Sequence, residues 1–284
     1  MVYFLSDAHI GSRAVDDAGH QHRFVALLEQ LAQDASAIYL LGDIFDFWAE
    51  YVWPDRSKQE YEPVLACLKR LTERGIAVHY FIGNHDIWTH GELSRLTGMT
   101  IHRRPEVLTI SGKRCLLAHG DGLVPADYLK QFPSEVQRKI RSFMRLRRLF
   151  HNPVAQFLFR LVPPAWGNRL GYNWAKRSRL KELDDPCGYK GEDREELVLY
   201  AKEMDQSAVS HWPLAVGCQE PKAKSQKPNI DYYIFGHRHI ELDLELASGA
   251  RVIILGDCFR QWTYASMNPD GKVVLDSWPL AVSY

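Results

Sequence analysis

The chain has 284 residues, of which 46% are hydrophobic and 25% charged, a composition typical of a globular enzyme with one large domain or two small ones. Lys and Arg together number 35, as do Asp and Glu, so the chain as a whole has no net field that would attract a polyanion. The five cysteines are widely spaced and include no Cys-x-x-Cys pair, which argues against a disulfide framework or a zinc ribbon and favours reduced thiols in the cytoplasm. We expect neither a signal peptide nor a membrane-spanning helix, because no segment has the apolar length that either requires.

Short apolar segments that end in polar clusters recur along the chain and predict buried strands. In chain order these segments are Val2–Ser6, Ala37–Leu41, Ala77–Ile82, Val107–Ile110, Cys115–Ala118, Tyr232–Phe235 and Arg251–Leu255. The first three alternate with two amphipathic stretches, Arg23–Ala32 and Val64–Gly75, whose apolar residues fall at helical spacing. Alternating strands and helices predict an α/β fold, in which active sites lie at the carboxyl ends of the strands.

The middle of the chain has a different pattern, with long helical segments rich in Arg, Phe and Trp. We therefore predict a core made of residues 1–132 and 200–284, with a helical cap inserted as residues 133–199. The polar segment Gln219–Pro228 is rich in Lys, Pro and Ser and predicts a mobile loop.

Polar residues suited to metal binding follow five of the predicted strands. A single Asp after a strand often caps a helix, and a single His behind an apolar segment is more often a core residue than a ligand. Five such clusters at equivalent strand ends favour a shared site instead, because the carboxyl ends of the strands converge on one crevice. The expected metal ligands are Asp7, His9, Asp43, Asn84, His119, His237 and His239.

Seven such groups are too many for one ion and suit two. Carboxylate, imidazole and amide ligands without a thiolate favour borderline-to-hard divalent cations, so we expect two Mn²⁺ ions, with Fe²⁺ and Zn²⁺ as alternatives. Two ions about 3.5–4 Å apart bind a bridging hydroxide and the oxygens of an in-line displacement. Asp43 is the expected bridging carboxylate, and Gly42, Gly83 and Gly236 allow sharp turns and close backbone approach just before the ligands.

The order and spacing of these motifs resemble those of the calcineurin-like metallophosphoesterases. The motifs are Asp7-Ala-His9, Gly42-Asp-Ile-Phe-Asp46, Gly83-Asn-His-Asp86, His119-Gly-Asp121 and Gly236-His-Arg-His239. The resemblance covers about residues 1–125 and 230–260 and implies a four-layer αββα sandwich. It assigns one metal to Asp7, His9, Asp43 and His239, and the other to Asp43, Asn84, His119 and His237. It also implies that His85, positioned by Asp46, stabilises the charge that develops on the phosphoryl group or protonates the leaving oxygen; the alternative is that His85 only neighbours a ligand.

The cap combines basic and large apolar residues. Between Val136 and Lys181 the sequence has twelve Lys or Arg residues and no Asp or Glu, interleaved with side chains such as Phe157 and Trp166. This pattern predicts contact with an anionic membrane surface, and its apolar face suits an acyl-chain groove. The alternative is a basic helix pair that packs its apolar face on the core.

Within the family, the chain is similar to the UDP-2,3-diacylglucosamine pyrophosphatases of lipid A biosynthesis, which carry a helical cap between the same two motifs. The resemblance extends to Leu40–Trp48, Ser94–Thr100 and His119–Leu123. It implies a nucleotide-sugar lipid substrate, cleaved by attack at the α-phosphorus to give UMP and 2,3-diacylglucosamine 1-phosphate, by a cytoplasmic enzyme peripheral to the inner membrane. The resemblance implies substrate contacts for Asp127, Ser178, Arg179 and Lys181, and we add Arg238 as a separate hypothesis, a cation near the phosphates.

Two positions depart from that branch, in which many members have Arg at the position of His85 and Thr at the position of Arg238. The alternative function is therefore a broader metal-dependent phosphodiesterase that acts on cyclic nucleotides or nucleic acid, and a scaffold without activity is a third reading. We expect no nucleic-acid partner, because the basic residues are confined to a strongly apolar cap rather than a groove with stacking aromatics. The sequence makes no prediction about oligomeric state.

Overall fold

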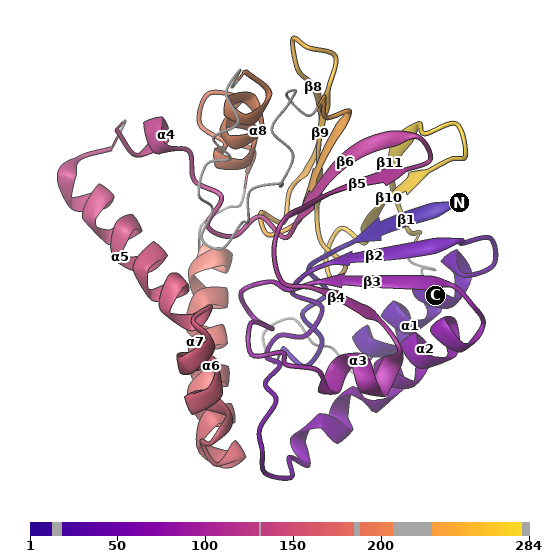
Figure 1. The fold of residues 1–284 in the computed structure, drawn as a ribbon, viewed down its shortest axis with the longest axis vertical. Coiled ribbons are helices and arrows are strands. Elements are labelled where there is room, and N and C mark those ends of the chain that lie inside the picture. The colour runs from indigo at the N-terminus through magenta and orange to yellow at the C-terminus, as the bar shows by residue number, and fades with distance from the viewer. Residues whose placement is uncertain (13–18, 131, 185–187, 207–228, 280–284) are drawn as a thin grey trace.

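The structure is a computed structural model that describes the chain except for residues 13–18, 131, 185–187, 207–228 and 280–284 (Figure 1). The predicted loop Gln219–Pro228 lies outside the described residues. Two β-sheets form the centre of the molecule, and helices cover their outer faces. Within the described residues no helix is long and apolar enough to cross a membrane.

The first sheet has six strands in the order β11-β10-β1-β2-β3-β4. Their bounds are β1 Val2–Leu5, β2 Ala37–Leu41, β3 Ala77–Phe81, β4 Thr100–His102, β10 Thr263–Met267 and β11 Val273–Ser277. β1 to β4 pair in parallel, whereas β10 and β11 pair antiparallel at the other edge. The carboxyl ends of β1, β2 and β3 therefore lie side by side.

The second sheet has five strands in the order β5-β6-β7-β9-β8. Their bounds are β5 Glu106–Ile110, β6 Lys113–Ala118, β7 Tyr232–Phe235, β8 Glu241–Glu245 and β9 Arg251–Leu255. The three central strands are parallel, and the edge strands β5 and β8 are antiparallel to them. A backbone hydrogen bond from Gly236 N–H to His119 O joins the ends of β6 and β7.

Successive residues of a strand point to opposite faces of its sheet, so each buried strand contributes side chains to two layers of the core. In β1, Val2 and Phe4 pack between the two sheets, while Tyr3 and Leu5 pack under the helices α1 His20–Leu31 and α2 Glu62–Glu73. The second sheet packs its outer face on α8 Glu196–Gln206 in the same way. The order of layers is helix, sheet, sheet, helix, which confirms the predicted four-layer αββα sandwich.

The cap consists of α4 Ala126–Lys130, α5 Ser134–Phe150, α6 Pro153–Arg160 and α7 Pro164–Asp184, which stand beside the two sheets in Figure 1. A separate apolar cluster joins it to the core, where Phe150 and Phe159 of the cap pack against Trp88. The predicted cap boundary at residue 199 cuts through α8, whose Leu197 is buried in the core. We therefore propose that the cap ends before α8.

All seven predicted strands are present, with ends that differ by two residues or fewer. Four strands, β4, β8, β10 and β11, were not predicted. The predicted helices correspond to α1 and α2, and the two short helices η1 Ser57–Tyr61 and α3 Glu92–Thr97 lie in the loops that follow β2 and β3.

Candidate metal centre

The ends of β1, β2, β3, β6 and β7 converge, and the structure brings all seven expected ligands to this one place. Five of them have a left-handed backbone although none is glycine, a conformation that L residues rarely adopt. These residues are Asp7 (φ 52°), His9 (φ 48°), Asp43 (φ 53°), His237 (φ 69°) and His239 (φ 50°). Strained backbone of this kind clusters at functional sites, where the surrounding structure holds it. Sequence alone gave no sign of this feature.

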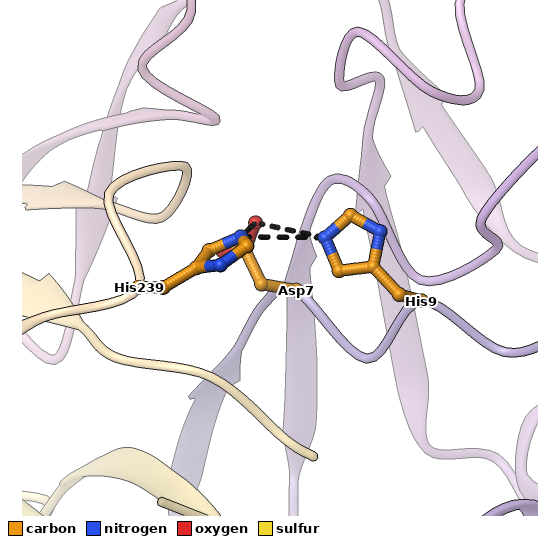
Figure 2. Close-up of side chains that lie close together, drawn as sticks. All are labelled: Asp7, His9 and His239. Atoms are coloured by element: carbon orange, nitrogen blue, oxygen red, sulfur yellow. Dashed lines mark hydrogen bonds and ion pairs between the residues drawn. The ribbon is translucent and has the colours of Figure 1, made fainter. Parts of the chain in front are cut away.

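One group of side chains surrounds the carboxylate of Asp7. His239 Nε2 lies 3.1 Å from Asp7 Oδ1, and His9 Nε2 lies 3.7 Å from the same oxygen. The two ring nitrogens are 3.3 Å apart, and Figure 2 shows both rings pointing toward the carboxylate. The three ligand atoms therefore lie 3.1–3.7 Å from one another, and all three residues are buried. Such a set is suited to a cation.

A second group surrounds the carboxylate of Asp43. His119 Nε2 lies 3.3 Å from Asp43 Oδ2 and 3.2 Å from Asn84 Oδ1, and His237 completes the set. His9 Nε2 of the first group lies 4.0 Å from the same oxygen of Asp43. Asp43 therefore lies between the two groups, where a bridging ligand is required.

Backbone groups orient these ligands. His237 N–H donates to Asp7 Oδ2 at 2.8 Å, and His85 N–H donates to Asp43 Oδ1 at 2.9 Å, so each carboxylate keeps its other oxygen for the site. His119 Nδ1 lies 2.8 Å from Leu41 O, to which it donates its proton. Because Nδ1 carries the proton, the lone pair of Nε2 faces the centre, as in metal-binding histidines generally.

The electrostatics of the site favour ionised carboxylates. Burial raises the pKa of Asp43, but the imidazoles of His119, His85 and His9 outweigh burial, and the pKa lies below its usual range. The pKa of Asp7 is lowered for the same kind of reason, chiefly by His239. Burial lowers the pKa of His237 to about 4, which keeps its ring neutral and its lone pair available to a metal.

The donor set fits two divalent cations. Two ionised carboxylates, four imidazoles and one amide oxygen converge without a thiolate, which is the ligand type of Mn²⁺, Fe²⁺ and Zn²⁺ sites. We propose Asp7, His9, His239 and the shared Asp43 for one ion. For the other we propose Asp43, Asn84, His119 and His237.

His85 borders this centre, with Nε2 3.9 Å from Asp43 Oδ2. Its Nδ1 lies 2.6 Å from the backbone oxygen of Asp46, to which it donates. The carboxylate of Asp46 is farther from that nitrogen, at 3.8 Å, and lies closer to His9 Nδ1, at 3.3 Å. Asp46 thus holds His85 chiefly through its backbone oxygen, and its carboxylate also lies at ion-pair distance from the same ring nitrogen.

The three glycines before the ligands have the close contacts that were predicted. A Cβ on Gly42 would lie 2.5 Å from His119 Nδ1, and a Cβ on Gly236 would lie 2.6 Å from Asp7 Oδ2. A Cβ on Gly83 would overlap the Asp43 carboxylate and lie 2.8 Å from Asp43 N. At these three positions the backbone lies closer to the ligand residues than it could if the residue carried a Cβ atom.

Asp86 also belongs to this part of the structure. Its side chain accepts hydrogen bonds from the Gly83 N–H, at 2.6 Å, and from the Tyr80 hydroxyl. Burial, followed by the charge of Asp43, raises the pKa of Asp86 to about 7. Asp86 therefore fixes the turn that carries Asn84 and His85.

The predicted substrate-binding residues have different outcomes. The side chains of Asp127, Ser178, Arg179 and Lys181 lie outside the described part of the chain. Arg238 Nε donates to Glu195 Oε1 at 2.6 Å, and Glu195 is fully buried. Its guanidinium is thus held by a carboxylate that sequence reasoning did not single out.

A pocket of about 340 Å³ extends from the centre to the cap. Asn84, His85 and His237 form its polar end. Its apolar walls come from both parts of the molecule and comprise Phe47, Ile87, Trp88, Leu146, Phe150, Phe159, Leu170, Trp174 and Ala175. Arg147 also lines the pocket and forms an ion pair with the buried Asp121, which connects α5 to the core. Asp121 follows His119 in the sequence, but its pairing with the cap had no local signal.

Comparisons with known proteins show which chains and which family this chain is similar to. The chain is 34% identical over 267 residues to the UDP-2,3-diacylglucosamine hydrolase of Porphyromonas gingivalis, covering 93% of this chain and 92% of that protein. It is 30% identical over 274 residues to the protein of the same name from Neisseria meningitidis, covering 95% of each chain. A dimetal phosphatase structure from Danio rerio aligns over 98% of both chains with 12% identity and a TM-score of 0.42. A sequence profile of the calcineurin-like phosphoesterases matches residues 1–241. The chain therefore belongs to the calcineurin-like phosphoesterase family.

Proposed function

We propose that this phosphoesterase hydrolyses the pyrophosphate of UDP-2,3-diacylglucosamine and releases UMP and 2,3-diacylglucosamine 1-phosphate. Two relatives that align with more than nine-tenths of the chain carry the name UDP-2,3-diacylglucosamine hydrolase. The donor set of the candidate centre supports a metal-dependent hydrolase, and we propose Mn²⁺ as the ion at both positions.

The observation that carries the proposal is the pocket between the centre and the cap. One end is polar and made of candidate ligands and His85, while the walls are mostly aromatic and aliphatic. A substrate that is both a phosphoric anhydride and a lipid matches these two ends. A soluble nucleotide would leave the apolar walls, including Trp174 and Leu170, in contact with water.

The chemistry at the polar end follows from the residues present. The two ligand groups would hold divalent cations, which would supply Lewis acidity and activate water as the nucleophile. The carboxylates of Asp7 and Asp43 keep the site anionic, and backbone N–H groups fix their orientation. Water attacks the α-phosphorus, the bond from that phosphorus to the bridging anhydride oxygen breaks, and this oxygen leaves on the lipid product.

His85 is positioned to assist the leaving oxygen. Its Nδ1 proton is held by Asp46 O at 2.6 Å, so Nε2 faces the pocket and the candidate ligands. An imidazole in this orientation can stabilise charge on a phosphoryl oxygen or pass a proton to the departing oxygen. We propose this role for His85 and a purely positional role for Asp46.

We also propose that the enzyme works at the cytoplasmic face of the inner membrane. The cap exposes large apolar side chains, with Trp166 70% exposed and Leu158 57% exposed. Another helix of the cap, α5, carries exposed Arg residues such as Arg138 and Arg141. Apolar and basic groups together suit an anionic lipid interface, from which a lipid substrate would enter the pocket.

The test compares acylated and non-acylated substrates. We expect the Mn²⁺-loaded protein to release UMP from UDP-2,3-diacylglucosamine with a kcat/KM at least about a hundredfold above that for UDP-N-acetylglucosamine. The reason is that apolar contacts to the two acyl chains of the lipid stabilise the bound substrate by several kcal/mol. Leu170→Ser and Trp174→Ser should reduce this preference by raising KM for the lipid. Equal rates on both substrates, or turnover of cyclic nucleotides alone, would contradict the proposal.

A further inference from the structure

A second cavity, of about 650 Å³, lies between the core and the cap and does not include any candidate metal ligand. Arg103 and Arg104, directly after β4, form its core side. Arg148 at the end of α5 and Arg160 at the end of α6 form its cap side. Ile87 lies between this cavity and the pocket of the metal centre, since it lines both. We call this space the arginine cavity.

The arginine cavity has an excess of positive charge. No acidic residue lines it, and none of its four guanidinium groups forms an ion pair with a carboxylate of the described residues. Glu50 favours the charged form of Arg103, but its carboxylate already accepts hydrogen bonds from the backbone N–H groups of residues 90–93. Arg103, Arg104 and Arg148 are exposed to solvent, and Arg103 donates a hydrogen bond to Thr89 O. Four cations that line one cavity repel one another, and an anion between them reduces that repulsion.

Buried polar atoms without a hydrogen-bond partner surround the same space. They are His90 Nε2, His151 Nε2, Gln156 Oε1 and Arg160 Nε. Buried polar atoms are nearly always paired with protein or water, so four such atoms on residues that line one cavity indicate a place that suits a polar group. A group bound in the cavity would have to accept a hydrogen bond from Arg160 Nε and donate one to Gln156 Oε1.

Gln156 gives the clearest orientation, because its side chain is only 7% exposed. Its amide nitrogen lies 3.1 Å from Ile87 O and 2.5 Å from Phe150 O, both of which are acceptors. The amide nitrogen must therefore face these carbonyls, and Oε1 remains as an unpaired acceptor. An occupant that carries a hydroxyl proton, such as a monoprotonated phosphate, would pair with it.

The two histidines are uncharged. Burial lowers the pKa of His90 to about 4, with further lowering by Arg160, and burial and Arg147 lower that of His151 to about 4. Neutral imidazoles offer hydrogen bonds to a bound group without adding to the charge of the arginines. Guanidinium groups are the usual partners of phosphate oxygens, to which they donate in pairs.

We propose that the arginine cavity is an anion-binding site for a phosphate group, separate from the metal centre, and that the bound phosphate joins the core to the cap. Arg104 of the core and Arg148 of the cap would donate to opposite sides of the same group. The phosphate belongs either to a small soluble molecule or to a lipid headgroup, which share this chemistry.

The test measures binding and not turnover, so it does not depend on the proposed reaction. Equilibrium dialysis of the Mn²⁺-loaded protein against radiolabelled orthophosphate should reveal a site that survives Asn84→Ala, a change confined to the metal centre. In that background Arg104→Gln and Arg148→Gln should each weaken phosphate binding at least about tenfold, as the loss of a charge-assisted hydrogen bond predicts. Arg141→Gln on the same helix and Arg114→Gln on the core are the matched controls and should leave it unchanged.

A second experiment decides whether the phosphate belongs to a lipid or to a soluble molecule. Vesicles of phosphatidylcholine with and without phosphatidic acid are sedimented with the same variants. If Arg104→Gln and Arg148→Gln reduce binding only to phosphatidic acid vesicles, the ligand is a lipid phosphate; if they reduce only orthophosphate binding, it is soluble. The proposal is overturned if neither variant affects either measurement, or if all phosphate binding is lost with Asn84→Ala.

Discussion

At the scale of single residues, the candidate centre depends on backbone that is costly to form. Asp7, His9 and Asp43 all have φ near 50°, which costs an L residue about 1–2 kcal/mol in each case. The paired strand ends hold this conformation, since Asp7 N–H donates to Gly42 O and His9 N–H donates to Asp43 O. The benefit is that consecutive strand ends aim their side chains at one point.

A substitution at Gly83 would test how tightly this backbone is packed. Gly83→Ala places a methyl group against the Asp43 carboxylate and backbone, so the two must separate. We expect bound metal to fall below one ion per chain and activity to fall at least about a hundredfold, because small misplacement of reacting groups has effects of this size. Elemental analysis and turnover measure the two effects.

Gly91→Ala is the control for that change, because nothing lies within 4 Å of the added methyl group. It should retain metal and activity. Full metal content in Gly83→Ala would show that Asp43 is not held against this turn.

His85 is predicted to act in catalysis without holding metal. His85→Ala should lower kcat about 10²–10⁴-fold, the usual range for a general acid or base, while both metal ions remain bound. Elemental analysis and steady-state kinetics separate these effects. His85→Arg should recover part of the rate, because a guanidinium also stabilises phosphoryl charge.

A different result would assign His85 to the metal site. Its ligand atoms also form a group with His9 and Asp46. If His85→Ala loses metal in proportion to activity, the residue is a ligand or supports one.

At the scale of elements, Glu50 organises the segment that leads into α3. Its carboxylate accepts hydrogen bonds from the N–H groups of residues 90–93 at 2.7–2.9 Å and from Trp48 Nε1 at 3.2 Å. Burial raises the pKa of Glu50, but the backbone donors, led by Glu92, outweigh burial and leave it below the usual 4.5. The ionised form is therefore bound more tightly in the folded protein than in the unfolded one.

This arrangement predicts how stability depends on pH. The contribution of Glu50 is fully present above about pH 4.5 and is lost as pH falls through its lower folded pKa. Glu50→Gln should lower the free energy of unfolding by about 1.5–3 kcal/mol at pH 7 and reduce the loss of stability below pH 4.5. Urea denaturation at pH 7 and at pH 4 measures both, and an unchanged pH dependence would contradict the role.

The strands that sequence predicted and those it missed differ in burial. β2, β7 and β9 are central, buried on both faces, and read as continuous apolar segments such as Tyr232–Phe235. β8 is an edge strand, Glu241–Glu245, with only partly buried leucines between acidic residues, and β4 has three residues. β4 is too short to carry a periodic signal, and β8 alternates leucines with acidic residues, so neither reads as a continuous apolar segment.

The candidate site, like the strands, was predictable only in part. Ligand types at strand ends identified the seven residues of the centre, because parallel strands end at one edge. Partners from distant segments were not predictable: Arg238 with Glu195, and Asp121 with Arg147, join segments with no local pattern in common. The arginine cavity likewise combines residues that follow β4 with residues of α5 and α6.

At the scale of the whole molecule, the cap presents apolar residues to the outside. Leu158 on α6 and Trp166 on α7 are more than half exposed. We expect Leu158→Ser and Trp166→Ser, combined, to reduce sedimentation with phosphatidylglycerol vesicles at least about tenfold, because two large side chains contribute about 1.5–3 kcal/mol each when buried. Hydrolysis of substrate dispersed in detergent should change little.

Val274→Ser is the matched control, because Val274 is 46% exposed on β11, which Figure 1 places away from the cap. Its vesicle binding should equal that of the unmodified protein. Equal loss in both variants would place the membrane contact elsewhere or exclude a specific one.

We propose that a metal-dependent site under the cap cleaves UDP-2,3-diacylglucosamine at its α-phosphorus. The most direct measurement is hydrolysis by the Mn²⁺-loaded protein in ¹⁸O-labelled water, followed by mass spectrometry of both products. We expect one ¹⁸O atom in UMP and none in 2,3-diacylglucosamine 1-phosphate, with no reaction in the Asp43→Ala variant. Label in the lipid phosphate, or no UMP at all, would contradict it.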